Sequence, residues 1–220
     1  LVSHVAVDRA DPAFDRPTKP IGPFFAEQQA ERVGRERGWQ MAEDVGRGYR
    51  RVVASPRPRG LLEVQALRCL LDAGCVVVAG GGGGVPVARR HERPGAPWEG
   101  IDAVIDKDYA AVELAREVGA DALVLVTGVD AVMVDFGSAH QRRLGCVDLA
   151  EVERHLAAGQ FAEGSMLPKV SAAAAFVRSG GEVAVVTTAA LAAATLRGGA
   201  EPAVALGTRI VATGRGEGVA

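Results

Sequence analysis

The chain has 220 residues, of which 48% are hydrophobic, and this is enough apolar material for a core of ordinary size. Its 25 basic and 27 acidic residues give a net charge of −2, so it offers no basic stripe for a polyanion, and we expect no nucleic-acid partner. The start of the chain has no basic segment followed by an apolar one, and the longest weakly polar run, 183–196, is too short to cross a bilayer. We expect no membrane association and a cytoplasmic location.

The first part of the chain predicts one strand and then a small separate module. Residues 2–7 alternate loosely as a strand, and the four prolines between residues 12 and 23 exclude a regular helix there. A helix is expected within 24–37, and residues 46–53 are typical of a hairpin.

Beyond residue 58 the pattern changes to alternating helices and strands. Leucines at helical spacing over 61–71 precede an apolar run over 75–79, which predicts a strand. A helix over 108–118 then precedes a strand over 122–126 that we expect to be buried on both faces. Repeated helix–strand units predict a parallel sheet.

Capping residues mark two further helices. Asp148 and Glu151 form a capping box for a helix that ends at Gly159, and Pro168 suits the first turn of a helix that runs to Arg178. The remaining predicted elements are a strand, a helix and a strand over 182–187, 191–196 and 208–211.

The cysteines and histidines indicate no metal site, because neither set has the spacing of metal ligands. The three cysteines lie in apolar stretches, which predicts buried thiols in a reducing compartment. These are Cys69, Cys75 and Cys146.

A run of glycines, Gly80–Gly84, follows the strand predicted over 75–79. Consecutive glycines let backbone N–H groups face an anion without obstruction by side chains. Val85 and Pro86 stand where a dinucleotide fingerprint needs its next glycine, and no lysine follows a glycine, so Rossmann and P-loop motifs are excluded. A tight exit from the strand is an open alternative. The candidate phosphate-binding residues are Gly80, Gly81, Gly82 and Gly83.

Lysine is rare in this chain, since three of its 25 basic residues are lysines and 22 are arginines. An ammonium is a compact charge that can follow a phosphoryl group, which a planar guanidinium cannot. Lys107, between Asp106 and Asp108, and Lys169 both lie at predicted helix starts, where a cation opposes the helix dipole unless an anion binds there. Lys19 lies between two prolines. The open alternatives are surface lysines and capping aspartates, and we rank Asp108 above Asp106 as functional.

Five segments, in this order and spacing, resemble carbamate kinases of the amino-acid kinase family. They are Pro17–Phe24, Gly80–Pro86, Ile105–Asp108, Thr127–Asp130 and Gly164–Lys169. The resemblance implies an α/β fold, a three-layer αβα sandwich with a mostly parallel sheet, plus a small protruding subdomain. The implied division is 1–7 as a strand of the main domain, 8–58 as the protruding subdomain, 59–212 as the rest of the kinase domain and 213–220 as a disordered tail.

The resemblance also implies reversible phosphoryl transfer between ATP and carbamate, giving ADP and carbamoyl phosphate, with Mg²⁺, a homodimer and a place in arginine metabolism. Lys107 and Lys169 would stabilise the transferring group, Asp108 would orient them, and Lys19 would approach from the substrate side. Such a reaction needs mainly positioning and charge stabilisation. The implied nucleotide-binding residues are Lys107, Thr127, Gly128, Val129, Asp130, Met166 and Lys169.

Three features depart from the carbamate kinase pattern. Ala131 stands where the family often has a tyrosine, and both the Gly-Gly-Asn loop and the His-Gly-Asn-Gly-Pro segment are absent from this sequence. Three hypotheses therefore stay open: a carbamate kinase lacking its N-terminal portion, a non-catalytic fragment that binds nucleotide or dimerises, and an amino-acid kinase with another acceptor.

Overall fold

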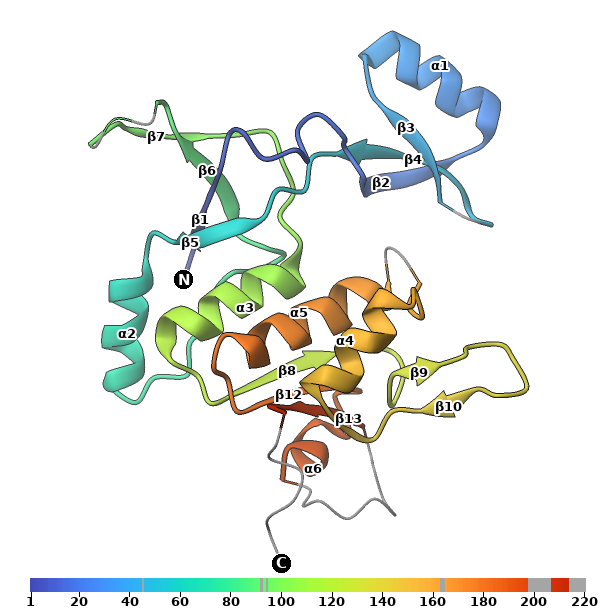
Figure 1. The fold of residues 1–220 in the computed structure, drawn as a ribbon. Coiled ribbons are helices and arrows are strands. Elements are labelled where there is room, and N and C mark those ends of the chain that lie inside the picture. Colours follow the sequence, from blue (N-terminus) through green and yellow to red (C-terminus); the bar gives the residue numbers. More distant parts are fainter. Residues whose placement is uncertain (45, 92, 94, 163–164, 198–206, 214–220) are drawn as a thin grey trace, which may run out of the picture. The chain divides into compact units, whose positions relative to one another are not determined.

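The computed structural model describes residues 1–44, 46–91, 93, 95–162, 165–197 and 207–213. The chain forms two compact units, Leu1–Glu113 and Leu114–Ala220 (Figure 1). Apart from Thr213, the predicted disordered tail lies outside the described residues. The predicted domain bounds stay a prediction.

The first unit contains a four-stranded mixed sheet in the order β5-β1-β6-β7. Its strands are β5 (Pro58–Leu61), β1 (His4–Val7), β6 (Val85–Arg89) and β7 (Trp98–Gly100). β1 runs parallel to β6 and antiparallel to β5. Val5 and Val7 are buried on one side of β1, which confirms the loose alternation seen in the sequence.

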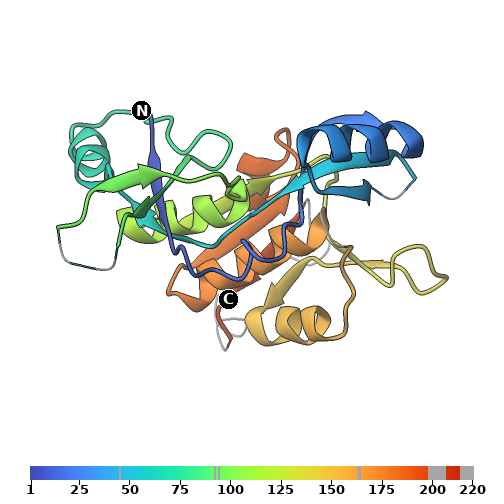
Figure 2. The same ribbon diagram turned by 90° about the horizontal axis from the view of Figure 1, so that it is seen from above.

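A second, three-stranded sheet in the same unit has the order β2-β4-β3, with strands β2 (Lys19–Phe25), β4 (Gly48–Val53) and β3 (Met41–Asp44). Helix α1 (Glu27–Arg37) lies against β3 and β4 (Figures 1 and 2). The hairpin was predicted, but β2 was missed because of its prolines. An edge strand tolerates Pro20 and Pro23, since it leaves some N–H positions unpaired.

The predicted strand over 75–79 is wrong. These residues follow helix α2 (Val64–Asp72) and form no strand, and the side chains of Val76 and Val78 are 98% and 81% exposed. An apolar run becomes a strand only beside another strand, and none of the described strands pairs with it. Cys69, Cys75 and Cys146 are all exposed, so the prediction of buried thiols is wrong as well.

The second unit contains the mixed sheet β11-β13-β12-β8. Its strands are β11 (Cys146–Asp148), β13 (Thr208–Val211), β12 (Val183–Thr187) and β8 (Ala122–Val126). Helix α5 (Met166–Arg178) covers one face and α6 (Ala192–Arg197) the other, while α4 (Leu149–Ala157) lies beside α5 (Figure 1). This arrangement gives three layers, as the α/β prediction requires.

The helix ends follow the predicted caps. The carboxylate of Asp148 accepts a hydrogen bond from the backbone N–H of Glu151 at 2.7 Å, and Gly159 takes a positive φ of 66° after α4. Helix α3 (Lys107–Val118) ends before Gly119, as expected.

β8 alternates between buried residues, Leu123 and Leu125, and partly exposed ones, and Val126 at its end is 51% exposed. The prediction of a strand buried on both faces is therefore wrong. No helix in the described ranges has both the length and the apolar character of a membrane span.

Candidate functional site

Charged residues from two distant parts of the first unit meet at the start of α3. The ammonium Nζ of Lys19, on β2, lies 2.5 Å from Oδ2 of Asp106. The other carboxylate oxygen of Asp106 accepts a hydrogen bond from the backbone N–H of Asp108 at 2.9 Å. Lys107 Nζ lies 3.8 Å from Asp108 Oδ2. The four charged residues that the sequence singled out in this unit thus form one cluster.

The two aspartates of this cluster are buried, whereas the side chain of Lys107 is 59% exposed. Burial tends to raise the pKa of Asp106, but the hydrogen bonds from Lys19 and from the backbone of Asp108, with the charge of Lys107, hold it below its usual value. Asp106 therefore stays ionised and keeps the Lys19 ammonium beside it.

The glycine run packs against the segment that carries this cluster. Gly83 is buried with φ of 131°, and a Cβ atom there would overlap the carbonyl oxygen of Ile105, the residue before Asp106. Gly80 N–H donates to Ser3 Oγ at 2.9 Å, and Gly83 N–H donates to the carbonyl of Gly80 at 2.8 Å. The N–H groups of Gly80 and Gly83 are thus used inside the protein. Among the four predicted glycines, those of Gly81 and Gly82 could still bind an anion.

The role of Ser3 carried no sequence signal. It is 4% exposed, and besides the bond from Gly80 its carbonyl accepts from the N–H of Val85 at 2.8 Å. Ser3, the residue before β1, therefore fixes both ends of the glycine run.

In the second unit, the predicted nucleotide segment Thr127–Asp130 directly follows β8. Thr127 N–H donates to the carbonyl of Thr187 at 2.9 Å, and the Thr187 hydroxyl donates to the carbonyl of Asp130 at 2.8 Å. Gly128, Val129 and Asp130 are exposed, while Thr187 is fully buried. The turn is thus fixed at the carboxyl ends of the parallel strands β8 and β12, which is where ligands bind in α/β sheets.

Ala131 and the start of α5 hold the remaining predicted site residues of the second unit. Ala131 follows the turn directly and is 1% exposed, so it belongs to the buried core. Met166 and Lys169 lie in the first residues of α5 and are half-buried. Ser165 makes no side-chain cap at this helix, but the Leu167 N–H donates to the carbonyl of Ala162 at 3.1 Å and Pro168 has no N–H, so neither can bind a phosphate oxygen. Gly164 of the predicted motif lies outside the described residues.

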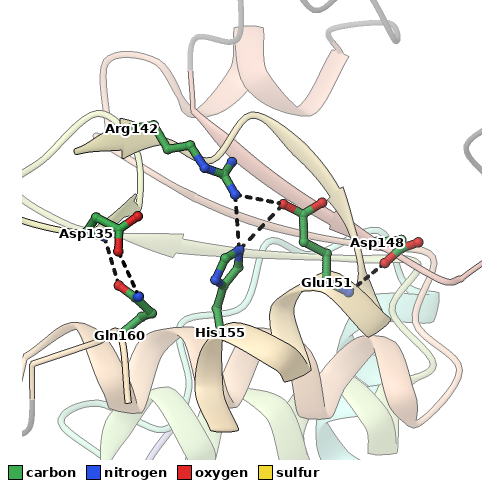
Figure 3. A network of polar contacts seen from close by, with 6 residues as sticks. All are labelled: Asp135, Arg142, Asp148, Glu151, His155 and Gln160. Atoms are coloured by element: carbon green, nitrogen blue, oxygen red, sulfur yellow. Dashed lines mark hydrogen bonds and ion pairs between the residues drawn. The ribbon is translucent and has the colours of Figure 1, made fainter. Parts of the chain in front are cut away.

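A polar network elsewhere in the second unit ties the hairpin β9 (Met133–Val134) and β10 (Arg142–Arg143) to α4 (Figure 3). Arg142 Nη2 lies 3.5 Å from Glu151 Oε1 and 3.4 Å from His155 Nε2. The Gln160 side chain accepts from the backbone N–H of Asp135 and donates to its carboxylate, at 2.8 and 2.9 Å. These bonds hold Asp135 at a positive φ of 51°. No predicted site residue takes part.

A pocket of about 390 Å³ lies between α1 and the strands β3 and β4. Glu27, Trp39 and Tyr49 line it, and none of the predicted site residues does. The charges of Glu27 and Glu43, together with burial, raise the pKa of Tyr49. The pocket is therefore separate from the charged cluster.

The donor set near the cluster suits Mg²⁺ only in part. Within the described ranges, no group of three or more His, Cys, Asp or Glu side chains is placed to hold a metal ion. Both carboxylate oxygens of Asp106 are already engaged. A Mg²⁺ ion here would therefore take most of its oxygen ligands from nucleotide phosphates and water, as Mg²⁺ commonly does.

Known proteins resemble this chain in both sequence and fold. The model of the amino acid kinase family matches residues 22–188. Carbamate kinase from Clostridium perfringens is 47% identical over 199 residues, which cover 90% of this chain and 62% of the relative. Carbamate kinase from Giardia lamblia bound to citric acid superposes with a TM-score of 0.85 at 36% identity, over 96% of this chain and 64% of that one. Its complex with AMP-PNP gives a TM-score of 0.81, again over 96% of this chain and 64% of that one. The chain thus spans less than two thirds of the length of these relatives, and it belongs to the amino acid kinase family.

Proposed function

We propose that the chain carries the nucleotide and phosphoryl-binding residues of a carbamate kinase-type phosphotransferase. The reaction would transfer the γ-phosphoryl group of ATP reversibly to carbamate, giving ADP and carbamoyl phosphate. The observation that carries this proposal is the cluster of Lys19, Asp106, Lys107 and Asp108 against the glycine run. The similarity to carbamate kinases supports the choice of acceptor.

In this proposal each residue acts through charge and position. Lys107 and Lys169 would neutralise charge that spreads over the equatorial oxygens in the transition state. Asp108 would orient Lys107, with which it is in contact. Lys19 would meet the acceptor side of the transferring group, and the N–H groups of Gly81 and Gly82 would bind its oxygens.

The nucleotide would bind in the second unit. The exposed turn Thr127–Asp130 and the start of α5, with Met166 and Lys169, support this placement. A relative that binds the ATP analogue AMP-PNP supports ATP and ADP as the nucleotides. Mg²⁺ would accompany the phosphates. We further propose a cytoplasmic homodimer that takes part in arginine metabolism.

The experiment that tests the reaction is ATP formation from ADP and carbamoyl phosphate by the purified chain, measured with a coupled assay. Turnover that requires both substrates is expected. Calorimetry with ADP runs beside it, because ADP binding without turnover would contradict catalysis and leave a nucleotide-binding protein. Absence of ADP binding at millimolar concentration would contradict both versions. An acceptor panel of other carboxylates separates carbamate from a different acceptor.

A non-catalytic role is the second candidate, and one observation favours it. The N–H groups of Gly80 and Gly83 are used inside the protein, so the glycine run offers an anion only two of its four predicted donors. Fewer donors at the transferring group mean less stabilisation of the transition state. The coupled assay decides between the two candidates.

A further inference from the structure

The pair of Lys19 and Asp106 joins residues that are 87 positions apart. Their side chains are 30% and 12% exposed, so water and salt weaken this pair less than they weaken a salt bridge on the surface. A cation held by a largely buried carboxylate has a defined position. An exposed lysine on an edge strand would otherwise sample many rotamers.

Asp106 is itself fixed from two sides. Its Oδ1 accepts from the N–H of Asp108, and its backbone carbonyl accepts from the N–H of Ala110 at 3.0 Å, so it caps α3. The preceding carbonyl, of Ile105, is packed against Gly83. The carboxylate therefore holds Lys19 at a set place relative to α3 and the glycine run.

The hydrogen-bonding capacity of Lys19 is not exhausted by this pair. An ammonium has three N–H donors, and Asp106 Oδ2 takes one of them. Two donors are left for the oxygens of an anion. Asp106 can thus hold Lys19 and still leave it able to bind a phosphoryl or carboxyl group.

We propose that Asp106 is a positioning residue for anion binding: it fixes the ammonium of Lys19 and acts on the substrate only through that group. The inference rests on the proposed function, because it takes the anion to be the phosphoryl-side substrate. A purely structural role for Asp106, as the cap of α3, is the competing explanation.

The chain allows a direct measurement of Lys19, because it contains only three lysines. Reductive methylation with ¹³C-formaldehyde would give one NMR signal for each lysine and one for the chain's amino terminus. We expect Asp106→Asn to raise the methylation rate of Lys19 several-fold and to leave that of Lys169 unchanged. An unchanged rate at Lys19 would overturn the proposal, because the pair would then not restrain the ammonium in solution.

Inorganic phosphate serves as the probe of anion binding, and it requires no turnover. Phosphate should slow the methylation of Lys19 in the unsubstituted chain, and in Asp106→Asn the concentration giving half protection should rise about tenfold. Equal protection in both proteins would overturn the proposal. The matched control is Asp44→Asn, which removes ion pairs with Arg47 at 2.7 Å and Arg50 at 3.5 Å in the same unit. It should leave both Lys19 readouts unchanged.

Kinetics separate positioning from a structural role. Asp106→Asn should raise the KM for carbamoyl phosphate about tenfold with a smaller change in the KM for ADP, and it should add nothing in a Lys19→Met background. An equal loss in both backgrounds would mean a structural role. Should the single variant fold poorly, Lys19→Met/Asp106→Asn, which removes both charges, provides the folded reference. Absence of turnover would contradict the proposed function alone, since the methylation readouts still decide the role of Asp106.

Discussion

The two units hold their candidate site residues in different ways. In the first unit the residues are charged and fix one another, as Lys19, Asp106 and Asp108 do. In the second unit the turn Thr127–Asp130 is held by backbone groups and by the hydroxyl of the fully buried Thr187. Charge substitutions and acid should therefore disturb the cluster of the first unit, whereas the turn of the second unit should respond to loss of packing or of neutral hydrogen bonds.

The largest expected effect concerns the lysines near the starts of α3 and α5. If the proposed function holds, Lys107→Ala in the first unit and Lys169→Ala in the second should each lower kcat for ATP formation by about 10² to 10³, since each would remove charge stabilisation from the transition state. The matched control is Arg178→Ala, at the other end of α5, which breaks a surface pair with Glu153 and should change kcat by less than about twofold. Normal turnover in either lysine variant would make that residue a surface lysine.

Removing the hydroxyl of Thr187 tests the neutral hydrogen bonds that hold the turn of the second unit. Thr187→Val keeps the side-chain shape but leaves the carbonyl of Asp130 without its donor, and we expect the free energy of unfolding to fall by about 1 to 3 kcal/mol. Urea titration measures this, and ADP affinity should fall as well. Thr188→Val, at a half-exposed neighbour, should stay within about 0.5 kcal/mol. Equal effects of the two substitutions would contradict the role assigned to Thr187.

Lowering the pH tests the contact between Glu63 and His4 in the first unit. Burial tends to raise the pKa of Glu63, but hydrogen bonds from the ring and backbone of His4 hold it below its usual 4.5. Because the folded pKa is the lower one, this contact contributes stability fully above the unfolded pKa and loses it as pH falls through the folded pKa. Glu63→Gln should cost about 1 kcal/mol at neutral pH and flatten the decline between about pH 5 and pH 3, measured by urea titration. An unchanged pH profile would contradict this account.

The smallest expected effect concerns the exposed apolar run after α2. Val76→Ser/Val78→Ser should change the free energy of unfolding by less than about 0.5 kcal/mol, because both side chains are exposed. It should still reduce aggregation, measured by light scattering, because an exposed β-prone run invites pairing between chains. Val185→Ser, at a fully buried position of β12, is the contrast and should destabilise strongly. Unchanged aggregation would show that another surface drives it.

The sequence predicted elements whose signals are local. The capping residue Asp148, the stop at Gly119 and the start of α5 all follow from residues within a few positions of each helix end. The strand predicted over 75–79 failed because a strand depends on a partner that is distant in sequence. β2 was missed for a related reason, since prolines are tolerated only at the edge position that the fold gives it.

The candidate site residues likewise divide into those with a local sequence signal and those without one. Rarity and helix-start position pointed to Lys107 and Lys169, and both lie in the first residues of helices. The partner of Lys19 could not be predicted from spacing, and Asp106 was ranked below Asp108 although it holds that lysine. A pair formed across 87 residues has no local signature.

The contact between Gly83 and the carbonyl of Ile105 offers a way to reshape the site by steric force alone. Any side chain at Gly83 would push away the peptide that precedes Asp106 and would also require a backbone conformation that only glycine adopts easily. The charged cluster would then shift although none of its own atoms had been changed. A substitution at residue 83 would therefore change the geometry of the charged cluster through steric contact alone, which is useful for protein engineering.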